Sequence, residues 1–193
     1  MPYISYSKKE ISFKIVYCGP GMSGKTTNLV HIHRTLSPEA RGDLVTLDTD
    51  QERTLFFDFF PVELGQSQGY QVRFNMYTVP GQSYYEACRR VVLEGVDGIV
   101  FVADSHPERL DDNLDSYRMM LKNLASFDID IKRFPAVLQY NKRDGPDPLP
   151  LGTLEKALGL NGIPVFASVA VNGSGVMETI RRITQIVIER FQI

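Results

Sequence analysis

A glycine-rich segment ending in a lysine and two threonines has residue types and a spacing that could bind phosphate. Residues 19–27 read Gly-Pro-Gly-Met-Ser-Gly-Lys-Thr-Thr, which matches G-x-x-x-x-G-K-[ST] between an expected strand and an expected helix. Glycines let successive backbone N–H groups curl around an anion, and the helix start adds partial positive charge. We therefore expect Lys25 to bridge the β- and γ-phosphates of a nucleotide and Thr26 to bind Mg²⁺.

The predicted phosphate-binding residues all lie in this one segment: Gly19, Gly21, Met22, Ser23, Gly24, Lys25, Thr26 and Thr27. The alternative interpretation is a glycine-rich turn that carries Lys-Thr by chance. The flanking strand and helix favour the phosphate loop, because the motif needs both of them.

A second motif, Asn141-Lys142-Arg143-Asp144, directly follows the apolar run at residues 136–140. The Asp144 carboxylate can accept the N1–H and the 2-amino group of guanine, and adenine offers neither. A buried carboxylate left unpaired disfavours the wrong base, sometimes by ~10⁴-fold or more. We expect Asn141 to tie the loop and base together and the Lys142 stem to cover one face of the ring. Alone, the four residues could form a solvated turn; with the phosphate loop they predict GTP or GDP as ligand.

A third contact with the base is expected after the apolar run at residues 165–169. The following loop, with Val169 and Ala170, precedes the last expected helix, and the backbone N–H of Ala170 could donate to guanine O6. This loop has no distinctive side-chain signature, so the prediction depends on its position.

Strand-like and helix-like segments alternate along the chain. Strands are expected at residues 3–6, 11–18, 44–47, 55–60, 72–78, 98–103, 136–140 and 165–169. Helices are expected at residues 25–36, 83–93, 107–127, 151–158 and 174–191. This order predicts a three-layer α/β/α fold with a mostly parallel sheet, an additional amino-terminal hairpin and one domain over residues 1–193. Ligands of such folds bind beyond the carboxyl ends of the strands, where all three motifs lie.

Composition excludes several other classes of protein. The 193 residues carry 21 Lys plus Arg and 23 Asp plus Glu, a net charge of −2, which argues against nucleic-acid binding through bulk charge. No stretch reaches the ~20 apolar residues of a membrane span, and residue 2 is Pro, so neither a span nor a lipid anchor is expected. Cys18 is expected to be a buried thiol. His31 and His33 face different ways on the expected helix, so a metal ion shared between them is not expected. Without a membrane span or a lipid anchor, the sequence predicts a soluble cytoplasmic protein.

The three motifs, in this order, are similar to the Ras superfamily of small GTPases. The hairpin, Gly-Pro-Gly-Met-Ser-Gly-Lys-Thr-Thr-Asn-Leu, Glu-Arg-Thr-Leu-Phe-Phe-Asp-Phe and Thr-Val-Pro-Gly-Gln resemble the MglA subfamily of bacterial gliding-motility and cell-polarity GTPases. The resemblance covers essentially residues 3–190. It implies the small G-protein fold of the P-loop NTPases, a GTP-hydrolysing switch, and a cytoplasmic protein that gathers at a cell pole when GTP is bound.

The resemblance also implies roles for residues of two switch regions. Thr54 would close on Mg²⁺ and the γ-phosphate, Gly81 would donate its N–H to the γ-phosphate, and Gln82 would orient the attacking water. Arg53 resembles a built-in arginine finger, which can accelerate hydrolysis ~10³-fold or more in related GTPases. Two alternatives stay open: Thr46 and Thr49 compete for the role of switch threonine, and Arg53 could be an ordinary surface charge.

One residue departs from the Ras-like pattern. Thr78 stands where most Ras-like proteins carry an Asp that helps to hold Mg²⁺ through water, so Mg²⁺ is expected to be held less firmly. Carboxylates nearby in sequence are Asp48, Asp50, Glu52 and Asp58. Slow hydrolysis is therefore expected until a partner orders the site. The resemblance implies that this partner is MglB, a Roadblock-fold dimer, and that polarity and motility effectors bind the GTP form.

The apolar run at residues 55–60 permits two interpretations. It could be a strand buried on both faces, or its pairing register could slide as the nucleotide changes, which would move Arg53 and Thr54. Two functional alternatives to the switch are a nucleotide-binding scaffold with negligible turnover and a P-loop kinase or ATPase. Asp144 opposes the kinase or ATPase because adenine cannot satisfy its carboxylate.

Overall fold

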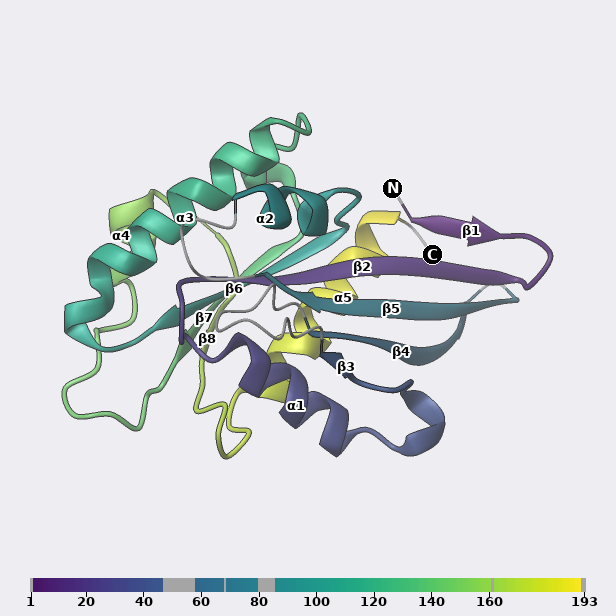
Figure 1. Cartoon of the computed structure of the whole chain (residues 1–193), viewed down its shortest axis with the longest axis horizontal. Helices are drawn as coiled ribbons and strands as arrows, with labels where there is room; N and C mark the ends of the chain where they lie inside the picture. The colour runs from purple at the N-terminus through teal and green to yellow at the C-terminus, as the bar shows by residue number, and fades with distance from the viewer. Residues whose placement is uncertain (1, 47–57, 68, 80–85, 161, 192–193) are drawn as a thin grey trace.

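The computed structural model describes residues 2–46, 58–67, 69–79, 86–160 and 162–191. Within these ranges, eight strands form one sheet in the order β3-β4-β5-β2-β6-β7-β8, with β1 paired to β2 (Figure 1). The strands are β1 Tyr3–Ser5, β2 Glu10–Cys18, β3 Val45–Thr46, β4 Asp58–Ser67, β5 Tyr70–Thr78, β6 Gly98–Asp104, β7 Ala136–Asn141 and β8 Val165–Ala167. The helices are α1 Lys25–Thr35, α2 Glu86–Leu93, α3 Leu110–Ala125, α4 Thr153–Leu158 and α5 Val176–Phe191, with 3-10 turns at η1 Pro38–Ala40, η2 Pro107–Arg109 and η3 Ile131–Arg133.

Strand direction separates the sheet into two parts. Strands β5, β2, β6, β7 and β8 run parallel to their neighbours in that order, so their carboxyl ends share one edge. Beyond β5, strand β4 pairs antiparallel with β5 and β3 pairs antiparallel with β4. Strand β1 pairs antiparallel with β2 in the amino-terminal hairpin. The predicted mostly parallel sheet with an additional hairpin is therefore confirmed.

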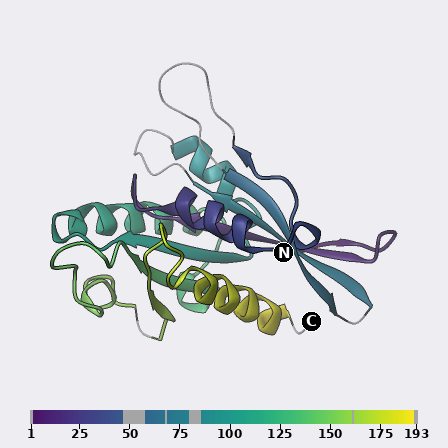
Figure 2. The ribbon, with the colours of Figure 1, turned by 90° about the horizontal axis from the view of Figure 1, so that it is seen from below.

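Helices cover both faces of the sheet. Helices α1 and α5 pack together on one face (Figure 2), against side chains such as Phe13, Ile15 and Val102. Helices α2, α3 and α4 cover the other face, against Val16, Phe101 and Leu138. Every residue of β6 and β7 is buried, which explains why these runs are mostly apolar rather than alternating; the buried polar residues are Gln139 within β7 and the terminal Asp104 and Asn141.

Several strand boundaries differ from the sequence prediction, and the largest difference is at the end of β4. Strand β4 extends to Ser67, although Pro61 and Gly65 disfavour a strand. Pro61 lies beyond the last β3–β4 pair, Val45 with Phe59, and its carbonyl oxygen accepts from the Gly42 N–H at 3.0 Å. The register of β4 against β5 shifts between Glu63 and Gln66. Residues 55–57 lie outside the described residues, so register sliding stays a prediction.

Strand β8 ends at Ala167, two residues earlier than predicted, because the chain turns there and Val169 pairs with Ser174 in an isolated bridge. Within the described ranges, none of the helices is both long and apolar enough to cross a lipid bilayer.

Candidate guanine-nucleotide site

The loop between β2 and α1 has a backbone that requires glycine at two positions. Gly19 has φ of 141°, and a Cβ there would lie 2.1 Å from the carbonyl oxygen of Val102. Gly24 caps the amino end of α1 with φ of 98°. Met22 also has a positive φ, of 64°, and its side chain is 87% exposed. The predicted phosphate loop therefore lies between a strand and a helix amino terminus, at the carboxyl edge of the sheet.

Lys25 is held inside this loop. Its ammonium donates hydrogen bonds to the carbonyl oxygens of Gly19 at 3.0 Å and Pro20 at 2.6 Å, and the residue is 7% exposed. Thr26 follows it in the first turn of α1 with an exposed side chain, and Thr27 is half-buried. Lys25 thus places a fixed positive charge at the loop, and the Thr26 hydroxyl is available to a hard cation such as Mg²⁺.

Asn141, at the end of β7, connects three loops through one side-chain amide. Its Nδ2 donates to the carbonyl oxygen of Ser23 at 2.8 Å. Its Oδ1 accepts from the Ala170 backbone N–H at 2.9 Å and from the Ser168 hydroxyl at 3.1 Å. In this structure the Ala170 N–H therefore already has a partner, so donation to guanine O6 would require sharing it. That contact stays a prediction.

A cavity of about 280 Å³ opens where these loops meet. The side chains of Lys142 and Asp144 lie along its wall, and Lys142 has a left-handed backbone with φ of 64°. The lining includes all five residues predicted for the base together with others: Met22, Gly24, Thr27, His106, Asn141, Lys142, Asp144, Gly145, Val169, Ala170 and Val171. A pocket of this kind suits a planar ligand, and recognition of the guanine edge by Asp144 stays a prediction.

Comparison with known proteins identifies the family. The model of the ADP-ribosylation factor family matches residues 3–187. The chain is also 46% identical over 188 residues to the mutual gliding-motility protein MglA of Myxococcus xanthus (strain DK1622), which covers 97% of this chain and 96% of that protein. The chain belongs to the ADP-ribosylation factor family of small GTPases.

As a small GTPase of this family, the chain is a nucleotide-dependent switch that binds GTP and GDP and hydrolyses GTP. The prediction of a Ras-like GTPase similar to MglA is confirmed, and so is the predicted P-loop fold.

The predicted switch residues are not among the described residues. Arg53, Thr54, Gly81 and Gln82 lie outside the described ranges, so their catalytic roles stay predictions. The same holds for Thr49, an alternative switch threonine, and for three of the carboxylates near Thr78 in sequence: Asp48, Asp50 and Glu52. Thr78, the departure from the Ras-like pattern, ends β5 and is 2% exposed.

Sequence reasoning missed Asp104, at the end of β6. Its buried carboxylate accepts hydrogen bonds from Lys142 Nζ and from His106 Nδ1, both at 2.7 Å. Burial alone would raise the pKa of Asp104, but the hydrogen bonds from Lys142 and His106 outweigh it and lower the pKa. The sequence feature that could have indicated Asp104 is its position: a carboxylate directly after a buried apolar run, at the carboxyl edge of the sheet where the other motifs lie.

A buried polar chain beneath the phosphate loop was missed as well. Gln139 Nε2 donates to Asn28 Oδ1 and to the Thr179 hydroxyl, each at 3.0 Å, and Asn28 Nδ2 donates to the Gly24 carbonyl oxygen at 2.9 Å. These three polar side chains are fully buried, one each on β7, α1 and α5. They fix the start of α1 against the centre of the sheet.

Proposed function

We propose that residues 1–193 form one G domain whose GTP-bound and GDP-bound shapes select different partners. The observation that carries this proposal is the Asn141 side chain, which joins the phosphate loop to both base loops around one cavity. A phosphate site and a guanine site held together in this way suit a single nucleotide that spans them.

The roles in binding follow from the chemistry of each group. Backbone N–H groups of the loop from Gly19 to Gly24, with the ammonium of Lys25, hold the phosphates. Asp144 accepts from the guanine edge, and the Lys142 stem covers the ring. Thr26 and, in the GTP form, Thr54 would hold Mg²⁺, which would supply positive charge against the phosphates.

Hydrolysis is an attack of water on the γ-phosphate. Gln82 orients that water, Gly81 donates its N–H to a γ-phosphate oxygen, and Arg53 neutralises charge as the bond to the β-phosphate breaks. Thr78 is uncharged, so it would hold Mg²⁺ less firmly than the usual Asp, and unassisted turnover would be slow.

The cellular role is proposed from the similarity to a gliding-motility protein. We assign the chain to bacterial cell polarity and motility, acting in the cytoplasm and at a cell pole in its GTP form. The activating partner is an MglB-like Roadblock-fold dimer that orders the catalytic residues, and polarity or motility effectors bind the GTP state. The second candidate is a GTP-binding scaffold with negligible turnover, which the uncharged Thr78 favours.

Two measurements test these proposals. Nucleotide released from the purified protein and separated by chromatography is expected to be GDP or GTP; a nucleotide-free protein that ignores both in Mg²⁺ buffer contradicts the site. Single-turnover GTP hydrolysis is then measured with and without a Roadblock-fold dimer. Acceleration by the dimer supports the switch, whereas no turnover above buffer in either case supports the scaffold.

A further inference from the structure

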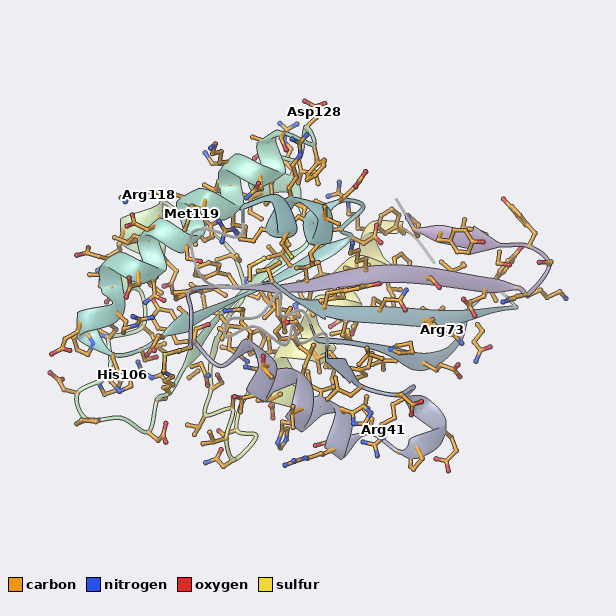
Figure 3. The ribbon with its side chains drawn as sticks, in the orientation of Figure 1. Arg41, Arg73, His106, Arg118, Met119 and Asp128 are labelled. Carbon is orange, nitrogen blue, oxygen red and sulfur yellow. The ribbon has the colours of Figure 1, made fainter. Side chains whose placement is uncertain are left out.

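The carboxylate of Asp104 lies at the centre of a small charged cluster beside the base cavity. It is 2% exposed and contacts Lys142 Nζ and His106 Nδ1 at 2.7 Å each. The backbone N–H of His106 also donates to it at 3.1 Å, and Arg109 Nε lies 3.8 Å away. His106, labelled in Figure 3, projects from the loop between β6 and α3.

This cluster reaches both halves of the nucleotide site. Lys142 and His106 line the base cavity. Arg109 donates from Nη2 to the carbonyl oxygen of Gly21 in the phosphate loop at 2.7 Å. One buried carboxylate therefore contacts the residue that covers the base and lies beside the residue that holds the phosphate loop.

The backbone at Asp104 is held by a separate set of contacts. Asn113, fully buried on α3, accepts from the Asp104 N–H at 2.9 Å and donates to the Asp104 carbonyl oxygen at 2.8 Å. Because these bonds do not involve the carboxylate, the charge can be removed by Asp104→Asn while the strand end keeps its anchors.

We propose that Asp104 is a positioning residue for nucleotide retention: its carboxylate orients Lys142 across the base cavity. A hydrogen bond between charged groups is directional and stronger than a neutral one, so the Lys142 stem is fixed before a ligand arrives. Without the charge, Lys142 samples more rotamers and must be ordered when the nucleotide binds. The inference deepens the proposed base site and rests on it.

The test is a double-mutant cycle on nucleotide release. Release of a fluorescent GDP analogue from full-length protein is measured for wild type, Asp104→Asn, Lys142→Met and the double variant. We expect Asp104→Asn to release the analogue about 10-fold faster, because one charge-assisted bond is lost. We expect the double variant to release it no faster than Lys142→Met. Asp115→Asn, an exposed carboxylate on α3 that pairs with Arg118, is the control and should match wild type.

A second readout separates positioning from general damage to the loop. Inosine diphosphate lacks the 2-amino group that Asp144 reads, so the ratio of GDP to inosine diphosphate affinity reports on Asp144. Asp104→Asn should weaken both ligands equally and keep the ratio, whereas a collapsed loop would move the ratio towards one and overturn the proposal. Additive effects of the two substitutions, or release at the wild-type rate, would also overturn it.

If Asp104→Asn does not fold, the cycle is run with Asp104→Ser, which also removes the charge. Faster release that is not additive with Lys142→Met supports the proposal, and wild-type release by Asp104→Ser contradicts it. Failure of wild-type protein to bind GDP would instead contradict the proposed function.

Discussion

The left-handed backbone at Gly24 disfavours any residue with a side chain, and the space beside it is filled. A Cβ at this position would lie 2.1 Å from Nδ2 of Asn141, the atom that holds the Ser23 carbonyl. Gly152 caps α4 with a similar φ of 92°, but a Cβ there would have nothing within 4 Å. Substitutions at the two positions can therefore be compared: at Gly152 an added side chain causes backbone strain alone, and at Gly24 it also causes a steric clash.

We expect Gly152→Ala to lower the free energy of unfolding by about 1 kcal/mol through strain alone and to leave GDP affinity unchanged. Gly24→Ala should carry the same strain and also displace Asn141, so GDP affinity should fall at least ~10-fold. Urea denaturation and GDP titration measure the two effects. Equal behaviour of the two variants would show that the Asn141 contact does not matter for binding.

Lys25→Ala should lose nucleotide affinity by ~10²-fold or more, because we propose that its ammonium binds the phosphates. Titration with GDP measures this, with circular dichroism as the check on folding. Tight GDP binding by a folded variant would contradict the assignment of the phosphate loop.

Asp144→Asn should shift base preference from guanine towards xanthine, because an amide can donate to the 2-oxo group that xanthine carries. GDP affinity is expected to fall ~10²-fold or more. Competition between GDP and xanthosine diphosphate measures the change, and Asp147→Asn, an exposed carboxylate in the same loop, is the control. Unaltered preference would remove Asp144 from its role.

Strand β7 is the element on which the base site depends most. It ends in Asn141, and Gln139 links it to the first turn of α1 and to α5. Replacing Gln139 by an apolar residue leaves the buried Asn28 Oδ1 without its donor.

We therefore expect Gln139→Leu to lower the free energy of unfolding by about 1–3 kcal/mol and to loosen the start of α1. Urea denaturation measures the loss, with Gln185→Leu on the exposed side of α5 as the control. The idea of a stabilising polar link fails if the two substitutions cost the same.

Sequence patterns located the elements and motifs because their signals are local. The lysine after six loop residues and the Asp three residues after Asn141 have spacings that chemistry requires, so both loops were found. Strand β4 was underestimated because Pro61 and Gly65 lower strand propensity, and pairing with β5 overrides it. The contact of Asp104 with Lys142 joins residues 38 apart and depends on the register of β6 against β7, which local pattern does not encode.

At the scale of the whole molecule, the nucleotide motifs lie at one end and the antiparallel strands project from the other (Figure 1). Between them lies a core with several buried titratable groups. Burial raises the pKa of Tyr117 from 10.0 to about 12, and its hydroxyl has no hydrogen-bond partner among the described residues. The unfolded chain therefore loses this proton at lower pH than the folded one, and stability falls as pH rises above about 10.

Tyr117→Phe should remove this dependence. At pH 7 its free energy of unfolding should equal or exceed that of wild type, because no hydrogen bond is lost. By pH 11 the variant should gain a further advantage of about 1 kcal/mol. Urea denaturation at pH 7, 9 and 11 measures the difference, with Tyr3→Phe at an exposed hydroxyl as the control. A constant difference across this range would contradict the expected effect of burial.

The single amide of Asn141 also has a consequence for nucleotide exchange. Its side chain is hydrogen-bonded to the Ser23 carbonyl on one side and to Ala170 and Ser168 on the other. The phosphate loop and the loop around Ala170 are therefore expected to move together. An exchange factor that displaces the phosphate loop would therefore also weaken binding of the guanine base. One that displaces the loop around Ala170 would weaken binding of the diphosphate without contacting the phosphate loop.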